Sequence, residues 1–466
     1  MSGYSKISSK LLKLKYFIQM KKINFIRNLL TPIRSLTLGF SILSLIGALI
    51  LMMPFSSSQG QYTSFLDSLF TSMSAVTTTG LIVVDTGTYF NKFGQSVIMI
   101  LFQIGGLGYM VFISLAVLGF AGKLSMSSRI LLRESISRPT KIDLLKFTKL
   151  IIISTVFIEL IGALLLTIYF SDYYPLGEAL FSAAFHSISA FTTAGFSVYS
   201  DSFMKYGNSL PFNLIILADM ILGSLGFFVL YDLAIFIFPN GKQSRRLSMH
   251  TKLIVSLTII LTLIGGVVIF MSESWSNANN FTDKILLSIF QASTASTTAG
   301  FNTLDIGLMT RASLFIMIIL MYIGAGPGST AGGIKQTTFG VILISLYNQL
   351  TGREKVLALK RRISEDTVKR SLSIAALALL WFVIAVLALT ISEDTDFLKI
   401  VYEVGSALGT VGLSAGITAD LSAFGKIVII ITMLIGRVGP LGIGLTILRG
   451  KKIASYQYPE EEILVG

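Results

Sequence analysis

Cysteine is absent from this 466-residue chain, and histidine occurs only twice. Without cysteine the chain forms no disulfide, no thiolate nucleophile and no cysteine-ligated metal site. The two histidines, His186 and His250, are too few and too far apart in sequence for a metal site. A membrane-embedded enzyme would need a nucleophile, paired acids or a metal, so we expect no catalytic residues and no enzyme.

Charge is also scarce. Only 13% of the residues are charged, 53% are hydrophobic, and the mean hydropathy is +0.77. A soluble domain of this length would need far more surface charge, so the composition predicts an all-α polytopic membrane protein without a separate soluble domain. Apolar segments long enough to cross a bilayer predict eight spans. They lie at residues 36–55, 95–120, 148–171, 212–238, 252–271, 312–346, 369–391 and 424–448.

One pattern occurs four times, each time between two predicted spans. The copies are FTSMSAVTTTGL (70–81), FHSISAFTTAGF (185–196), FQASTASTTAGF (290–301) and YEVGSALGTVGL (402–413). Each begins with an aromatic residue, followed five positions later by alanine and five positions after that by glycine. Because the period and the internal register agree, chance similarity is a poor explanation, and the pattern indicates four repeats.

A short apolar stretch before each glycine is too brief to span the membrane and suits a re-entrant helix. Residues of types that cap or favour the start of a helix stand seventeen positions before the four glycines. They are Thr63, Glu178, Asp283 and Thr395. Each repeat is therefore expected to be a span, a half-helix, a turn and a second span.

Four irregular turns at membrane depth must be buried or line water, because their unpaired carbonyls cannot face lipid. Around one axis they would form a ring of carbonyl oxygens that replaces the hydration shell of a monovalent cation, and glycine permits the backbone this requires. A single Thr-Thr-Ala-Gly is more simply a threonine-capped turn, but four copies in register favour the ring. The candidate ion-binding residues are Thr77, Thr78, Thr79, Gly80, Thr192, Thr193, Ala194, Gly195, Thr297, Thr298, Ala299, Gly300, Gly409, Thr410, Val411 and Gly412.

Basic residues predict the orientation in the membrane. The segments 121–147, 239–252 and 347–370 are cytoplasmic by the positive-inside rule, and the acidic segments that hold the four turns then face outside. Eight spans place both termini in the cytoplasm. The net charge of +13 is mostly topological, and no nucleic-acid partner is expected, because the basic residues are split among loops. These loops could instead receive an acidic partner or anionic lipid. Their arginines include Arg129, Arg133, Arg138, Arg245, Arg246, Arg361 and Arg362.

Residues 323–338 interrupt the sixth span with more helix-breaking residues than a continuous helix carries. One interpretation is a kinked helix packed against its neighbours. A damaged phosphate loop is excluded, because the lysine follows isoleucine and glutamine follows the lysine. The residues of interest here are Gly324, Gly326, Pro327, Gly328, Ser329, Thr330, Gly332, Gly333 and Lys335.

Arg437 stands in the last predicted span without an acidic residue within ten positions. A charge at this depth is costly unless it meets water or a partner. One interpretation pairs it with carbonyls or with a distant carboxylate, and the other places it in the pore wall below the turns, where it would repel cations. The candidate carboxylates are Asp219, Asp232 and Glu159.

These motifs resemble those of the Trk/Ktr/HKT superfamily of potassium transporters, and particularly its Ktr-type membrane subunit. The resemblance covers nearly the whole chain and rests on the four turns, on GAGPGSTAGGIK (324–335), on IGRVGP (435–440) and on the terminal PEEEILVG. It implies four membrane-pore-membrane repeats in pseudo-fourfold symmetry around one pore per subunit, a homodimer, and a cytoplasmic nucleotide-binding ring of the RCK type that gates the pore. It also implies that residues 323–338 form a gating loop beneath the filter and that Arg437 is the pore barrier.

In related proteins a serine in place of the first filter glycine goes with sodium transport. All four positions are glycine here, so the resemblance implies potassium, with Na⁺ as a coupling or activating ion expected only from the family. The first three turns carry a single glycine and the fourth, GTVGL, matches the TVGYG signature of potassium channels only in part. We therefore expect fewer well-formed ion sites than in a channel filter.

The predicted organisation comprises a basic cytoplasmic N-terminus (1–35), four repeats (36–120, 148–238, 252–346 and 369–448) and a cytoplasmic tail (449–466). The expected function is K⁺ translocation in a regulated uptake system of the bacterial plasma membrane. A sodium-translocating relative of the same superfamily is the alternative. An assembly scaffold is a further hypothesis, under which the four turn glycines would be dispensable.

Overall fold

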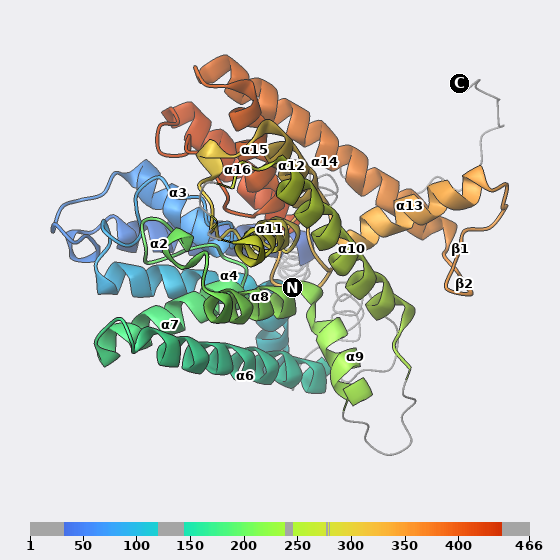
Figure 1. Ribbon diagram of the computed structural model, residues 1–466, viewed down its shortest axis with the longest axis horizontal. Coiled ribbons are helices and arrows are strands. Elements are labelled where there is room, and N and C mark those ends of the chain that lie inside the picture. The colour runs from blue at the N-terminus through green and yellow to red at the C-terminus, as the bar shows by residue number, and fades with distance from the viewer. Residues whose placement is uncertain (1–31, 120–143, 238–245, 276–277, 279, 440–466) are drawn as a thin grey trace, which may run out of the picture.

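The computed structural model describes residues 32–119, 144–237, 246–275, 278 and 280–439, and Figure 1 shows their arrangement. Helices make up most of the described structure, which confirms the predicted helical fold. One departure is a small antiparallel hairpin, β1 (Leu357–Ala358) with β2 (Arg361–Arg362), in a segment predicted as a loop. The predicted tail 449–466, nearly all of the N-terminal segment 1–35, and Arg129, Arg133, Arg138 and Arg245 lie outside the described residues.

The described helices follow one order four times: a long helix, a short buried helix, and a third helix. Figure 1 colours these four units in sequence from blue to red. The first is α2 (Pro32–Leu51), α3 (Phe65–Val76) and α4 (Lys92–Gly119), and the second is α6 (Leu144–Phe170), α7 (Leu176–Phe191), α8 (Leu210–Leu225) and α9 (Phe227–Ile237). The third is α10 (Met249–Ser272), α11 (Phe281–Ser296), α12 (Arg311–Ile323) and α13 (Gln336–Leu350), and the fourth is α14 (Glu365–Ser392), α15 (Phe397–Gly409) and α16 (Ala423–Val438). Short 3₁₀ turns are η1 (Pro54–Ser56), η2 (Met204–Tyr206) and η3 (Ile306–Leu308).

The short helices α3, α7, α11 and α15 begin close to the predicted positions but with different caps. Ser64, Asn280 and Asp396 accept hydrogen bonds from first-turn backbone N–H groups, and Pro175 precedes α7. Asp283 lies inside the first turn of its helix, where a negative side chain interacts favourably with the positive end of the helix dipole. The expectation that Thr63 and Thr395 mark helix starts is off by one residue, because the side chains of Ser64 and Asp396 make the capping bonds.

Helices are present in all eight predicted spans, but not all are continuous. Three described helices are long and apolar enough to cross a membrane alone: Lys149–Phe170, Met249–Ser272 and Glu365–Ser392. The pair α8 and α9 passes the same test together but bends by 106°. The other predicted spans are shorter or interrupted in the described part of the chain.

The interruptions share a cause. The third helix of each unit breaks or ends at a glycine in the left-handed region, with φ values of 53°, 96°, 69° and 93°. Only glycine adopts this conformation without a steric penalty, so the helix cannot continue through these positions. The sequence predicted such a break in the third unit alone. The four glycines are Gly108, Gly226, Gly324 and Gly439.

The units close into a ring. The third helix of each unit packs against the short helix of the next: α4 against α7, α8 against α11, α12 against α15, and α16 against α3. The last of these contacts joins the end of the described chain to its beginning, so the four units form a closed ring. The aromatic residue that leads each repeated motif is fully buried, namely Phe70, Phe185, Phe290 and Tyr402.

Outward faces of the long helices are apolar and exposed. Ile153 and Leu164 on α6, Leu263 on α10 and Leu380 on α14 are each more than half exposed in the isolated chain. Exposure of so much apolar surface to water is unfavourable, whereas contact with the hydrocarbon of a bilayer is not. These faces are therefore the lipid-contacting sides of the spans.

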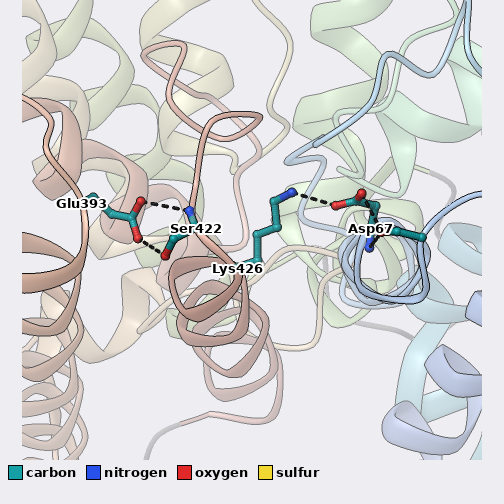
Figure 2. A network of polar contacts seen from close by, with 5 residues as sticks. Asp67, Glu393, Ser422 and Lys426 are labelled. Atoms are coloured by element: carbon teal, nitrogen blue, oxygen red, sulfur yellow. Dashed lines mark hydrogen bonds and ion pairs between the residues drawn. The ribbon is translucent and has the colours of Figure 1, made fainter.

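Charged residues tie the fourth unit to the first at one end of the ring. Lys426 at the start of α16 places its Nζ 2.7 Å from Oδ1 of Asp67 in the first turn of α3. Figure 2 shows Lys426 reaching across to Asp67 while Glu393 faces Ser422. The hydroxyl of Ser64 donates to the second oxygen of Asp67, so the same carboxylate serves the helix cap and the junction between units.

Candidate functional site

The four predicted turns have nearly the same backbone conformation. Two residues before each glycine stands a threonine with φ between 49° and 56°, a left-handed conformation that is uncommon for a β-branched residue. The residue before each glycine donates its backbone N–H to a carbonyl five positions earlier, at 2.8 to 2.9 Å. Strained backbone repeated four times at one place indicates a functional constraint. The four threonines are Thr78, Thr193, Thr298 and Thr410.

The turn glycines lie against one another's backbone. A Cβ atom added to Gly80 would lie 2.5 Å from the carbonyl oxygen of Ala194, and one added to Gly195 would lie 3.0 Å from that of Ala299. In the same way Gly300 contacts the carbonyl of Val411, and Gly412 contacts that of Thr79. Each glycine thus meets the residue before the next unit's glycine, and the fourth returns to the first.

This closed order joins the four turn glycines and the residue before each of them, and the other eight of the sixteen residues proposed for the ion site lie in the same four turns. The turn threonines, Ala194, Ala299 and Val411 are completely buried. Every glycine position excludes a side chain by contact with backbone, and glycine's positive φ, from 70° to 97°, adds a second reason. Chemically, four backbone carbonyls in a ring could replace water molecules around a partly dehydrated cation.

Hydroxyl groups behind the turns fix their geometry. Ser74 and Ser406 accept the backbone N–H groups of Gly80 and Gly412, both at 3.0 Å. Ser189 instead donates to the carbonyl of Phe196 at 2.8 Å. Sequence reasoning missed these residues, although the signal was available: a serine or threonine stands six positions before each turn glycine.

The segment between α12 and α13 lies directly against the turns. The hydroxyl of Thr78 donates to the carbonyl of Thr330 at 3.3 Å, and the hydroxyls of Thr193 and Thr330 are 3.3 Å apart. The backbone N–H of Gly332 donates to the hydroxyl of Thr298 at 3.4 Å. The structure therefore favours the loop interpretation of this segment over a merely kinked helix.

The fourth turn completes the contact with this loop, because a Cβ on Gly332 would collide with the side chain of Thr410. The loop is held by bonds to the second unit and to itself. Thr330 donates from its hydroxyl to backbone carbonyls of Phe191 and Gly223, at 2.9 and 3.1 Å respectively. Lys335 folds back and donates to the carbonyls of Ala331 and Gly332 at 2.7 and 2.9 Å.

Arg437 pairs with backbone carbonyls. Its guanidinium donates to the carbonyl of Thr330 in the loop and to those of Gly105 and Gly106 in α4. The arginine thus connects three units: its own, the loop of the third, and the first beside the break at Gly108. The acids considered as its partners make other bonds. Asp219 accepts from Ser187, Glu159 from Gln103, and Asp232 from Ser248.

Three of the four helix breaks are also marked in the sequence. A second glycine stands three positions before each, at Gly105, Gly223 and Gly436. A Cβ at these positions would collide with the carbonyl of the last residues of the short helix, at Val76, Phe191 and Leu408. The Gly-x-x-Gly spacing therefore lets the third helix pack tightly beneath the turn and then break.

These features define a membrane protein of four pseudo-symmetric units around a central ring of turns. The chain matches the model of the TrkH family, described as a cation transport protein, over residues 20–458, and it belongs to that family. It is a membrane subunit of the Trk/Ktr class of transporters.

One relative is the Ktr system potassium uptake protein B of Bacillus subtilis (strain 168), which is 40% identical over 96% of this chain and 99% of the relative. The potassium/sodium uptake protein NtpJ of Enterococcus hirae is 35% identical over 95% of this chain and 98% of the relative. The crystal structure of the potassium transporter TrkH from Vibrio parahaemolyticus has the same fold, with a TM-score of 0.68 at 19% identity, covering 89% of this chain and 84% of that one.

Proposed function

We propose that this chain is the potassium-translocating membrane subunit of a regulated uptake system, and that the ring of four turns is its selectivity filter. The closed order of glycine and carbonyl contacts among the turns carries this proposal. Four carbonyls at membrane depth replace part of the hydration shell of a cation. An inside-negative potential favours cation entry by about 2.3 kcal/mol per 100 mV.

Potassium is favoured over sodium by the turns themselves and by the relatives. All four filter positions are glycine, which leaves the ring free of side chains. Relatives along nearly the whole chain are named potassium uptake proteins, and NtpJ is named for potassium and sodium together. A sodium-translocating relative is therefore the second candidate, and dependence on Na⁺ as a coupling or activating ion belongs to the same proposal.

The loop of residues 324–335 is the proposed gate, and Arg437 the proposed barrier. Contacts from all four filter threonines to Thr330 and Gly332 support a position in the ion path. Displacement of the loop would break weak bonds of 3.3 to 3.4 Å and would free the underside of the filter. A cation would then meet Arg437, whose charge sets a barrier.

We further propose a homodimer in the bacterial plasma membrane, both termini in the cytoplasm, and a nucleotide-binding RCK-type ring as the cytoplasmic partner. The exposed Arg361 and Arg362 of the hairpin, with Arg246 before α10, support this orientation. The repeats are assigned to residues 36–120, 148–238, 252–346 and 369–448, in keeping with the four helical units.

Uptake of ⁸⁶Rb⁺ by liposomes holding the purified chain tests the proposal. Liposomes loaded with K⁺ or with Na⁺ are diluted into ion-free medium, so that outflow of a permeant ion drives tracer inward. We expect uptake with internal K⁺ and little with internal Na⁺. Uptake driven mainly by internal Na⁺ would favour the sodium-translocating alternative, and equal uptake with both ions would refute selectivity for K⁺. Uptake with neither ion, even with the cytoplasmic partner added, would refute translocation.

Two glycine variants separate the filter from general backbone strain. Gly300→Ser places a side chain against the carbonyl of Val411, and we expect it to reduce K⁺-driven uptake or to admit Na⁺. Gly60→Ser is the matched control, because Gly60 also has positive φ, 67°, but has no atom within 4 Å of its Cβ position. An unchanged ion preference in Gly300→Ser would remove the turns from the ion path, as a scaffold requires.

A further inference from the structure

In all four units the position directly after the aromatic residue that begins the repeated motif is polar and fully buried. The four side chains differ in chemistry: they are Thr71, His186, Gln291 and Glu403. They lie behind the turns, because the same helices end in the turns. A buried polar group without a partner is costly, so each of these positions raises the question of what it contacts.

Two of the four side chains contact the segment that leaves the filter. His186 places Nε2 3.0 Å from the hydroxyl of Ser197, and Glu403 accepts a hydrogen bond of 2.8 Å from the hydroxyl of Ser414. Ser197 and Ser414 both stand two residues after their filter glycine. In the ring order of the units, the second and the fourth lie opposite each other.

In the fourth unit the buried side chain accepts from two hydroxyl groups. Glu403 also accepts a hydrogen bond from the hydroxyl of Thr418 with its other carboxylate oxygen. Ser414 in turn accepts the backbone N–H of Gly416 at 3.1 Å. One fully buried carboxylate therefore holds two points of the segment that follows Gly412.

This contact bears on the position of the filter carbonyls. Gly412 is fixed on its N-terminal side by the bond from its N–H to Ser406, and on its C-terminal side by Ser414, two residues away. Gly412 also contacts the carbonyl of Thr79 in the first unit. A shift of the exit segment would therefore move this contact and the ring it closes.

The other two positions make no such connection in the part of the chain that the structure describes. The hydroxyl of Thr71 and both polar atoms of the Gln291 amide have no hydrogen-bond partner there. Burial behind the filter is thus common to all four units, whereas the link to the exit segment is confined to two. The link is a separate feature and not a by-product of burial.

We propose that Glu403 is a positioning residue of the filter, which sets the preference for K⁺ over Na⁺ by holding the exit segment of the fourth turn through Ser414 and Thr418. This inference rests on the proposed function. K⁺ and Na⁺ differ in size and hydration, so the spacing and stiffness of the carbonyl ring decide between them. Loosening one side of the ring lets the carbonyls close on the smaller ion.

The test compares Glu403→Gln, Ser414→Ala and Thr418→Val with the unchanged protein in the K⁺-loaded and Na⁺-loaded liposomes. Glutamine keeps the shape but replaces one acceptor oxygen by an NH₂ donor. We expect the ratio of K⁺-driven to Na⁺-driven ⁸⁶Rb⁺ uptake to fall several-fold in Glu403→Gln and Ser414→Ala. In the double variant Glu403→Gln/Ser414→Ala, the uptake ratio should fall no further than in either single variant, because the two residues act through one bond.

Thr71→Val is the matched control, since it removes a buried hydroxyl at the same position of the first unit that has no partner among the described residues. Its uptake ratio should equal that of the unchanged protein. A fall in total uptake with an unchanged ratio in Glu403→Gln would reduce Glu403 to a structural residue and overturn the inference. If that variant is not recovered as a monodisperse protein, Ser414→Ala and Thr418→Val decide, because both retain the carboxylate.

Failure of this inference is distinguishable from failure of the proposed function. Absence of K⁺-driven uptake in the unchanged protein refutes translocation before any variant is considered. Selective uptake in the unchanged protein, with the same ratio in Glu403→Gln and Ser414→Ala, refutes only the role of Glu403.

Discussion

Arg437 of the fourth unit donates a hydrogen bond to the backbone carbonyl of Thr330 in the loop of the third unit. The same residue, Thr330, accepts from the turn threonine Thr78 with that carbonyl. The arginine, the loop and the first of the four turns are therefore joined through one peptide group. Displacement of Thr330 would break the bond to Arg437 together with the bond to Thr78.

Replacement of Arg437 tests this coupling. We expect Arg437→Ala to raise ⁸⁶Rb⁺ uptake several-fold in the isolated subunit, because both the positive charge and the bonds to Thr330, Gly105 and Gly106 are lost. Arg437→Lys keeps the charge but not the planar fork of donors, so its uptake should lie between those of the alanine variant and the unchanged protein. If the lysine variant matches the unchanged protein, charge alone makes the barrier and the clamp on the loop is irrelevant.

Thr330→Val probes the loop from its other side. The change keeps the side-chain shape but leaves the carbonyls of Phe191 and Gly223 without the hydroxyl that they share. We expect a loss of stability of about 1–3 kcal/mol and a higher basal uptake. Ser329→Ala is the control, because the Ser329 hydroxyl donates only within the loop, to Gly326 at 2.6 Å. Equal uptake in both variants would argue against a role of the Thr330 anchor in gating.

Repetition explains how much of this fold was readable from the sequence. The four turns, the preceding short helices and their register followed from one motif, because each copy supports the others. The break in the third unit was visible through its many glycines and Pro327. The breaks at Gly108, Gly226 and Gly439 were missed, because glycines within an apolar helix are usually tolerated and the Gly-x-x-Gly spacing was not taken as the sign of a break.

Partners across the ring were not readable from the sequence. The two interpretations of Arg437 could not be separated, because its acceptors are backbone carbonyls more than one hundred residues away, and a carbonyl has no residue type. The link from Glu403 to Ser414 escaped notice for another reason. The equivalent positions of the other three units carry threonine, histidine and glutamine, so comparison of the repeats does not single out a glutamate at this position.

The ion pair between Asp67 and Lys426 should stabilise closure of the ring. Only 15% of the lysine and 25% of the aspartate side chain is exposed, so the pair is less screened than a surface bridge. A cycle of Asp67→Asn, Lys426→Met and the double variant should give a coupling free energy of about 1 kcal/mol in unfolding by detergent titration. The coupling should decrease with added salt. Additive effects of the two changes would mean that the pair does not hold the first and fourth units together.

Protonation of Glu393 should weaken the same end of the molecule at acidic pH. Burial alone would raise the pKa of this carboxyl, but the hydroxyl of Ser422, the backbone N–H of Ser422 and the hydroxyl of Ser392 donate to it and lower its pKa below the ordinary value of 4.5. A pKa that is lower in the folded state gives stability that is full above the unfolded value and is lost as pH falls through the folded one. The melting temperature of the unchanged protein should therefore exceed that of Glu393→Gln at pH 6, and the difference should shrink below about pH 4.5. Ser392→Ala removes one of the three donors, so at pH 6 its melting temperature should lie between those of the unchanged protein and Glu393→Gln. If the melting temperatures of the unchanged protein and Glu393→Gln differ by the same amount across this pH range, Glu393 acts by packing and not by charge.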